Sequence, residues 1–256
     1  MGRPGKAPCS IRNPKSKIGS SFPHWKPSTI AVYTLGVSET APANSARFVQ
    51  IVQPLLERQD LTGLVATLKK NWTKDQICGM LHDPCSDVRK VAALAIGFVG
   101  CKRCVSDLAA LLKDPDPVMN EMAEHAMWSI WFHGSTPAAN DQLARGAQAL
   151  NRRDLDHAVK HFNKALTIDP EFPEAFNQRA IAHYLAERYE HSILDCRRAI
   201  DRNDFHFGAW AGMGHSHAHL GCFIQAIDCY ERALQINPRL DGVQSTLREL
   251  RGQTDL

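Results

Sequence analysis

Small residues recur at a fixed interval in the C-terminal half of the chain, and this interval limits the possible folds most severely. When the sequence from Ala139 is divided into units of 34 residues, the next two units begin at Pro173 and Phe207. Three positions of each unit are then small: Gly146, Ala180 and Gly214 at the eighth, Ala158, Ser192 and Ala226 at the twentieth, and Ala165, Ala199 and Ala233 at the twenty-seventh. Helices that cross at close range need small side chains there, because larger ones hold the backbones apart. The interval therefore predicts three stacked helical hairpins.

The same units resemble the tetratricopeptide repeat. Large side chains fill complementary positions, namely Phe176 and Trp210 at the fourth, and Phe162 and Tyr230 at the twenty-fourth. The resemblance implies three repeats over residues 139–240, with residues 241–256 as a capping helix and C-terminal tail. The middle unit departs from the pattern at Cys196 and at Asp204, where the other units have proline.

A second interval, of 31 residues, relates the segment MLHDPCSDVRKVAALAIGFVG from Met80 to LLKDPDPVMNEMAEHAMWSIW from Leu111. Each copy has a helix that ends before Asp-Pro and a second helix rich in alanine, because proline cannot continue the first helix. The pair resembles short HEAT repeats, although the second copy has Met119-Asn120 where the first has the typical Val-Arg. We expect residues 46–134 to form a HEAT-like α-repeat segment, with Trp128 and Trp131 packing its junction with the later repeats.

Beyond Ala46 the apolar residues recur every three or four positions and no stretch alternates like a strand. The predicted fold class is therefore all-α, a right-handed α-solenoid. Residues 1–45 are rich in Pro, Gly, Ser and Lys, and we expect a disordered basic tail. A targeting segment is the alternative there, but its apolar part is short and begins late for an export signal.

Charge and composition exclude some functions. Residues 1–45 hold six basic residues and one acid, so the remaining chain carries −2 of the net +3. A nucleic-acid reader is expected to carry its positive charge on the folded part. No apolar run approaches the length of a membrane span. The eight cysteines form no regular framework, which favours a reducing compartment, and we expect a cytoplasmic protein.

The third unit contains the segment HSHAH, which invites comparison with a metal site. Residues two apart on a helix point about 200° apart, so His217 faces away from His215 and His219. A zinc site needs further ligands. At the eleventh position the family has a tyrosine, and here His183 and His217 stand there, so we expect both to be partly buried packing residues.

Family resemblance implies that the second, fifth, ninth, twelfth and thirteenth positions line a concave groove. The predicted groove residues are Asn140, Leu143, Asn177, Ile181, Tyr184, Ala211, His215 and His219, with Glu174 among the second-position residues. Such a surface is mildly apolar and nearly uncharged, and suits a peptide or amphipathic helix of another protein. The alternative is that the same face packs against the HEAT-like segment or a second copy of the chain. Family members that bind the carboxylate tail of heat-shock chaperones have Lys at the fifth position and Asn at the ninth, a combination that no unit here has.

Cys101 and Cys104, in the segment CKRC, are the one cysteine pair two residues apart. Zinc would require more ligands from Cys78, His82 and Cys85. A helix over residues 87–99 would hold His82 and Cys85 about 20 Å from Cys101 and Cys104. We therefore expect packing thiols, no metal and no cofactor.

No nucleophile elbow, phosphate loop or dinucleotide fingerprint occurs. The sequence predicts a non-catalytic protein-interaction module, an adaptor, scaffold or assembly factor, whose partner is another protein. Two alternatives remain open: an enzyme or lyase-type accessory protein built on the HEAT-like repeats, and nucleic-acid binding through the basic tail. The sequence does not indicate whether the protein forms homo-oligomers.

Overall fold

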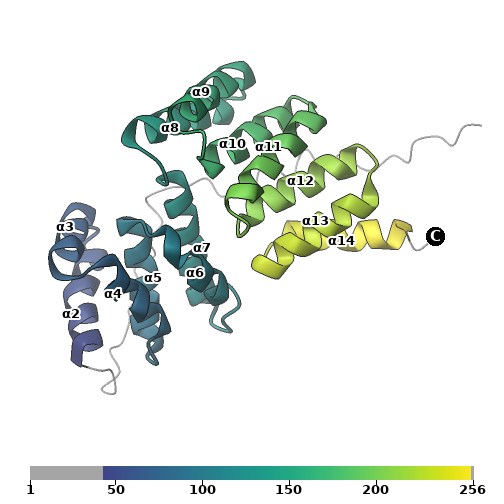
Figure 1. Ribbon diagram of the computed structural model, residues 1–256. Coiled ribbons are helices and arrows are strands. Elements are labelled where there is room, and N and C mark those ends of the chain that lie inside the picture. Colours follow the sequence, from purple (N-terminus) through teal and green to yellow (C-terminus); the bar gives the residue numbers. More distant parts are fainter. Residues whose placement is uncertain (1–42, 255–256) are drawn as a thin grey trace, which may run out of the picture.

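The computed structural model describes residues 43–254, and within that range every regular element is helical (Figure 1). The elements are α2 (Ala43–Glu57), α3 (Leu61–Asn71), α4 (Lys74–Gly79), the short 3₁₀ turn η1 (Met80–His82), α5 (Ser86–Val99), the 3₁₀ turn η2 (Lys102–Cys104), α6 (Val105–Leu111), α7 (Pro117–Phe132), α8 (Pro137–Asn151), α9 (Leu155–Ile168), α10 (Pro173–Leu185), α11 (Tyr189–Arg202), α12 (Phe207–His219), α13 (Phe223–Ile236) and α14 (Asp241–Thr254). The all-α solenoid predicted from the sequence is confirmed.

Three hairpins, α8–α9, α10–α11 and α12–α13, stack in order and end in α14 (Figure 1). Glycine permits the close approach inside the first and third hairpins. A Cβ at Gly146 would lie 2.3 Å from the ring of Phe162, and one at Gly214 would lie 2.6 Å from the ring of Tyr230. The eighth and twenty-fourth positions of a unit are therefore complementary in size, which explains why the middle unit combines Ala180 with the smaller Cys196.

The helix α14 covers the end of the array. Its residues Val243, Leu247 and Leu250 are buried together with Tyr230 and Ala233 of α13. The other face of α14 is polar, as the sequence predicted for a terminal cap.

One turn geometry closes all three hairpins. Arg153, Glu187 and Gly221 have φ of 61°, 60° and 75°, and they are separated by the repeat length. Each is followed by a residue whose amide donates to the carbonyl five residues earlier, as in Cys222 N to His217 O at 2.9 Å. This arrangement is the Schellman motif, in which the left-handed position favours glycine.

Replacing Arg153 with glycine is expected to stabilise the protein by about 0.5–1 kcal/mol, because an exposed L-residue is strained in the left-handed conformation. Chemical unfolding monitored by circular dichroism measures the change. Arg152 is the matched control, since it has φ −83° at the preceding position. Glycine at Arg152 should lower stability, and an equal effect at both positions would contradict the assignment.

The N-terminal half contains the two related segments. In each, an aspartate before proline accepts a backbone hydrogen bond two residues ahead: Asp83 Oδ1 from Cys85 N at 2.8 Å, and Asp114 Oδ1 from Asp116 N at 2.9 Å. The second helices of the two copies, α5 and α7, pack closely, and a Cβ at Gly97 would lie 3.1 Å from the Cα of Ala126. Helix, Asp-Pro turn and alanine-rich helix are arranged as the sequence predicted.

Asn120 performs the role of Arg89 in the second copy. Arg89 Nη1 donates to Asp83 O at 2.8 Å, and Asn120 Nδ2 donates to the equivalent Asp114 O at 2.8 Å. The replacement that weakens the sequence match therefore keeps the hydrogen bond that fixes the turn.

The first described helix begins earlier than expected. The helix α2 begins at Ala43, so residues 43–45 are not part of a tail, because Ser45 is buried and its hydroxyl donates to Asp83 Oδ2 at 2.6 Å. The remaining residues of the predicted basic tail or targeting segment lie outside the described range. No helix in the described range is long and apolar enough to cross a lipid bilayer.

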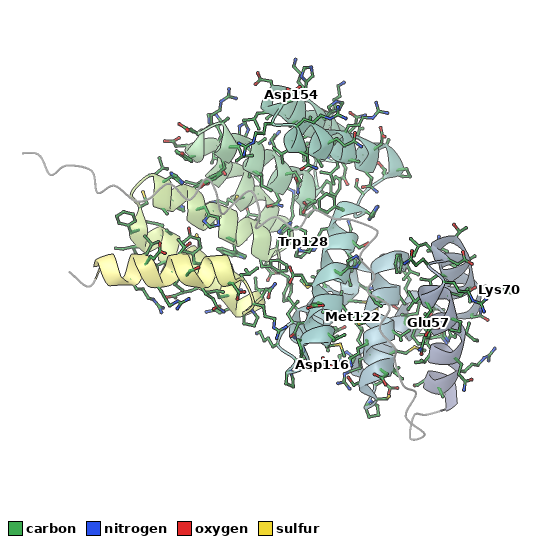
Figure 2. All side chains as sticks on the ribbon, turned by 180° about the vertical axis from the view of Figure 1, so that it is seen from behind. Glu57, Lys70, Asp116, Met122, Trp128 and Asp154 are labelled. Carbon is green, nitrogen blue, oxygen red and sulfur yellow. A yellow bond between two sulfur atoms is a disulfide. The ribbon has the colours of Figure 1, made fainter. Side chains whose placement is uncertain are left out.

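The helix α7 joins the two halves. Trp128 and Trp131 lie near its C-terminal end, and both contact Phe207 at the start of α12. Figure 2 shows Trp128 between α7 and the C-terminal helices. Trp131 stacks on His206 with ring centroids 4.2 Å apart, and Trp128 meets Phe207 edge-on at 5.4 Å. The prediction that these tryptophans pack the junction is confirmed.

Candidate functional site

Five of the eight predicted groove residues are buried rather than open to a ligand: Leu143, Asn177, Ile181, Tyr184 and Ala211. Leu143 is fully buried in the core of the first hairpins, and Asn177 is 1% exposed. Asn140 is half-buried and hydrogen-bonds both backbone groups of Ser135, so it holds the short connection between α7 and α8. The surface that is open to a ligand is therefore smaller than the eight predicted groove residues imply.

A polar network buried at the junction explains the burial of Asn177. Glu174 is 0% exposed and lies in the first turn of α10. Its carboxylate accepts from Gln178 Nε2 at 2.7 Å and, at longer range, from Asn177 Nδ2 at 3.4 Å. His206 Nε2 lies 2.8 Å from Glu174 Oε2. Because His206 Nδ1 accepts from Ala209 N at 3.1 Å, its Nε2 carries the proton and donates to Glu174.

The tryptophan end of α7 closes this part of the concave face. Trp131 covers the ring of His206, and a Cβ at Gly208 would lie 2.9 Å from the Trp128 ring. Farther along α7, Glu124 Oε2 accepts from the buried Asn237 at the end of α13, at 3.2 Å. Helix α7 therefore packs against the start of α12 and the end of α13.

The rest of the face carries a cluster that we call the histidine–tyrosine patch, formed by Tyr184, Tyr189, His215, His219 and Tyr230. His219 stacks on Tyr189 at 4.7 Å and meets Tyr184 edge-on at 5.3 Å. Tyr230 Oη and His215 Nδ1 are hydrogen-bonded at 2.8 Å. His215 and His219 are half-buried. Two predicted residues flank the patch, Ile181 and Ala211, and both are buried.

Burial keeps three members of the patch, Tyr184, His215 and Tyr230, uncharged at physiological pH. Loss of solvent lowers the pKa of His215 to about 4, with a further contribution from His219. The pKa values of the Tyr184 and Tyr230 hydroxyls are raised, mainly by the same loss of solvent. The Tyr184 hydroxyl is buried and has no hydrogen-bond partner within the protein. The patch therefore presents aromatic rings and polar atoms, of which those of His215 and Tyr184 carry no charge.

Acidification is expected to destabilise the protein through His215. Its pKa is lower in the folded state than the ordinary value of 6.5, so the unfolded chain binds the proton more tightly. The stabilisation is complete above about pH 6.5 and is lost as the pH falls toward 4, amounting to about 2 kcal/mol between pH 7.5 and pH 5.

Urea unfolding of the wild type and a His215→Gln variant at those two pH values measures this contribution. The variant should lose about 2 kcal/mol less than the wild type on acidification. Other histidines, including His183, contribute in the same direction and remain in both proteins. Equal acid sensitivity of the two proteins would show that His215 is protonated as readily when folded.

The three alternating histidines do not converge. His215 and His219 belong to the patch, whereas His217 is half-buried elsewhere, where burial and Arg197 lower its pKa. His183 is also half-buried, 3.8 Å from Asp195. The prediction that His183 and His217 are partly buried is confirmed.

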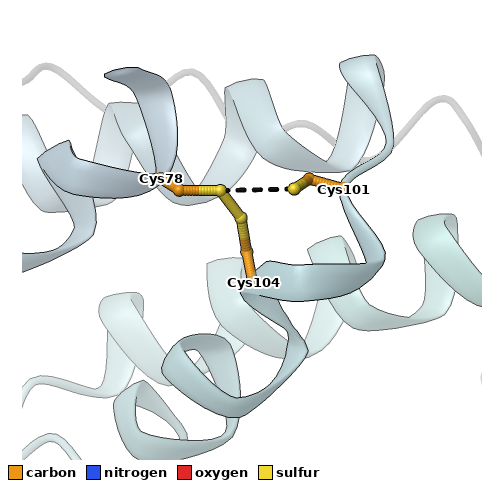
Figure 3. A group of neighbouring side chains, drawn as sticks. All are labelled: Cys78, Cys101 and Cys104. Atoms are coloured by element: carbon orange, nitrogen blue, oxygen red, sulfur yellow. Dashed lines mark hydrogen bonds between the residues drawn. A yellow bond between two sulfur atoms is a disulfide. The ribbon is translucent and has the colours of Figure 1, made fainter. Parts of the chain in front are cut away.

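The structure brings together three cysteines that the sequence analysis separated. Cys78 and Cys104 form a disulfide, and the Cys101 sulfur lies 3.3 Å from that of Cys78 (Figure 3). Among the described residues they are the one group of metal-ligating side chains close enough to share an ion. The expectation of loop and packing thiols at Cys101 and Cys104 was wrong for Cys104, whose sulfur is bonded to that of Cys78. That expectation rested on the length of α5, which separates the residues before it from those after it. Helix α4 runs antiparallel to α5, so Cys78 lies near the C-terminal end of α5.

Comparisons with known proteins agree with the repeat architecture. Residues 208–240 match the family model described as Tetratricopeptide repeat. Over 87 residues the chain is 36% identical to Anaphase-promoting complex subunit 3 of Schizosaccharomyces pombe, covering 34% of this chain and 13% of that protein. It is 28% identical over 103 residues to Small glutamine-rich tetratricopeptide repeat-containing protein 2 of Mycosarcoma maydis, covering 40% and 29%. The chain thus spans less than a third of either relative.

A solved structure described as the first TPR of Spaghetti (RPAP3) bound to HSP90 peptide SRMEEVD is 21% identical, with a TM-score of 0.47, and the match covers 48% of this chain and 97% of that one. The sequence match to the third unit coincides with α12, α13 and the turn that follows. The third hairpin therefore matches the tetratricopeptide repeat in sequence, and the first and second hairpins share its length and its turn geometry.

Proposed function

We propose that the protein is a non-catalytic interaction module, an adaptor, scaffold or assembly factor, that binds a segment of another protein on the histidine–tyrosine patch. The observation that carries this proposal is the Tyr184 hydroxyl, buried among neutral rings and without a partner in the protein. A buried hydroxyl without a hydrogen bond is costly. A peptide amide or carbonyl that reached it beside the His219 ring would recover that cost.

The chemistry of the patch favours a peptide with apolar or aromatic side chains. The solved relative bound to an HSP90 peptide supports a peptide as the class of ligand. An acidic tail is disfavoured, because the positions that hold lysine and asparagine in chaperone-binding members are Leu143 and Ala147, Asn177 and Ile181, and Ala211 and His215 here. These positions therefore give an acidic tail no lysine to pair with.

Selection of binders from a displayed library of unstructured peptides, with the full chain as bait, tests the proposal. Enriched peptides should lose affinity about tenfold or more for Tyr184→Phe, which keeps the ring and removes the hydroxyl. His219→Glu should bind more weakly still, because it puts a charge on the patch. His157→Glu is the matched control, since His157 is exposed on α9.

Two results would contradict binding at the histidine–tyrosine patch. Peptides that bind wild type, Tyr184→Phe and His219→Glu with equal affinity would place the site elsewhere. Binding that falls steeply with salt and disappears on removal of residues 1–42 would instead favour nucleic acid or another polyanion on the basic tail.

We also propose that residues 46–134 are a HEAT-like segment and residues 139–240 the repeat domain, with residues 241–256 as cap and tail. The paired Asp-Pro turns and the close packing of α5 on α7 support the first assignment. A cytoplasmic location is part of the same proposal and rests on the irregular spacing of the cysteines. In that compartment the Cys78–Cys104 pair would be exposed to thiol reductants.

A further inference from the structure

The three cysteines come from two segments that the fold holds firmly together. Cys78 is near the end of α4, whereas Cys101 precedes η2 and Cys104 is its last residue, after the last turn of α5. Their sulfur atoms all lie within 4.8 Å of one another (Figure 3). Cys101 and Cys104 are buried, and Cys78 is half-buried.

Contacts on either side of the sulfur atoms fix the two segments. Thr73 and Gln76 form a capping box at the start of α4. Lys74 Nζ donates to Gly100 O at 2.6 Å, and Arg103 pairs with Asp75 at 2.6 Å. Gly100 has φ 64°, which turns the chain sharply after α5. The cluster is therefore held by local contacts that do not involve the sulfur atoms themselves.

We propose that, once the disulfide is reduced, Cys78, Cys101 and Cys104 bind one zinc ion as thiolates. A disulfide joins two sulfur atoms and leaves Cys101 without a role, whereas a metal uses all three. Zinc–sulfur bonds of about 2.3 Å around one ion place the sulfur atoms about 3.8 Å apart. The present cluster, with one pair at 3.3 Å and all within 4.8 Å, needs only small side-chain movements to reach that geometry.

The charge and exposure of the cluster suit this ion. Three thiolates and Zn²⁺ sum to −1, and the cations Lys74, Lys102 and Arg103 lie on the same two segments. Cys78 is the most exposed of the three, so the fourth zinc position faces solvent on its side and takes a water molecule. His82 lies outside the group, with its ring 3.5 Å from Asp107 and exposed.

Reduction of the disulfide precedes zinc binding. A phosphine reductant opens the Cys78–Cys104 bond, and it becomes a phosphine oxide with oxygen from water while the two sulfur atoms become thiols. Zinc then displaces three protons from the three thiols. Zinc binding and the disulfide are mutually exclusive, because both need the sulfur atoms of Cys78 and Cys104.

Titration of the reduced full chain with zinc, under argon and in competition with a chromophoric chelator, tests the proposal. We expect one zinc ion per chain and a thermal midpoint that rises with zinc concentration. Cobalt in place of zinc should give the near-ultraviolet absorption of thiolate ligands. Cys101→Ser should weaken binding at least about 100-fold, while Cys85→Ser, which changes a half-buried cysteine outside the group, should not.

Circular dichroism must show that each variant remains helical, and Cys104→Ser provides a second ligand variant if Cys101→Ser unfolds. Zinc binding by the reduced wild type no tighter than that of a chain with all three cysteines replaced by serine would overturn the proposal. Equal affinity of wild type and both folded ligand variants would also overturn it. This result is independent of the peptide-binding patch, which lies on α10–α13.

Discussion

Replacing Trp131 with alanine is expected to lower the free energy of unfolding by about 3–5 kcal/mol. The side chain is 5% exposed and contacts His206 and Phe207 across the junction. Its loss leaves a cavity and uncovers the polar network around Glu174. Chemical unfolding gives the energy, and hydrogen exchange should show faster exchange at the starts of α10 and α12.

Two comparison variants separate this effect from a general loss of packing. Trp131→Phe keeps an aromatic ring on His206 and removes an indole N–H that is buried without a partner, so it should cost less than about 1.5 kcal/mol. Trp72→Ala removes a tryptophan that packs on Phe48 far from the junction, and it should leave exchange in α10 and α12 unchanged. If Trp131→Ala costs under about 1 kcal/mol, the junction does not hold the two halves together.

Substituting Glu174 with glutamine is expected to cost about 2–4 kcal/mol although the two side chains have nearly the same shape. All three neighbours of the carboxylate donate hydrogen bonds to it: Gln178, Asn177 and His206. The amide group of glutamine would point a donor at one of these donors. His206 cannot adapt by moving its proton to Nδ1, because that nitrogen accepts from Ala209 N.

The matched control is Glu190→Gln, in the first turn of the next helix, where the side chain is exposed; it should change stability by less than about 0.5 kcal/mol. A double-mutant cycle with His206→Gln should give a coupling of more than about 1 kcal/mol. Equal stability of Glu174→Gln and the wild type would show that the three donors do not require a carboxylate at this position.

The sequence predicted the repeat hairpins because their packing depends on residues a fixed distance apart. Gly146 and Phe162 occupy the same positions of their unit as Gly214 and Tyr230, and each pair makes the same close contact. The Asp-Pro turns were predictable for the same reason. Helix ends were less so: α8 begins at Pro137, two residues before the predicted unit, because the Thr136 side chain caps it.

The junction and the cysteine cluster escaped sequence reasoning because both join residues that no interval relates. Glu174 stands at a position that faces the ligand in the tetratricopeptide repeat family. Only the structure shows that α7 covers it, through Trp131 and His206. His206 lies in a turn, and nothing in the sequence pattern marks it as buried except that it precedes Phe207. The Asp-Pro turn between α4 and α5 indicates that the two helices are antiparallel. From that turn, Cys78 could have been predicted to lie near Cys101.

Solenoids commonly tolerate a gain or loss of units, because each unit touches only its neighbours. Here α7 contacts both the second and the third unit. Trp131 stacks on His206, and Glu124 accepts a hydrogen bond from Asn237. A 34-residue insertion between the first and second hairpins would carry both contact points away from α7. The number of repeats is therefore locked by a helix outside the array, so lengthening or shortening this chain requires redesign of α7 as well.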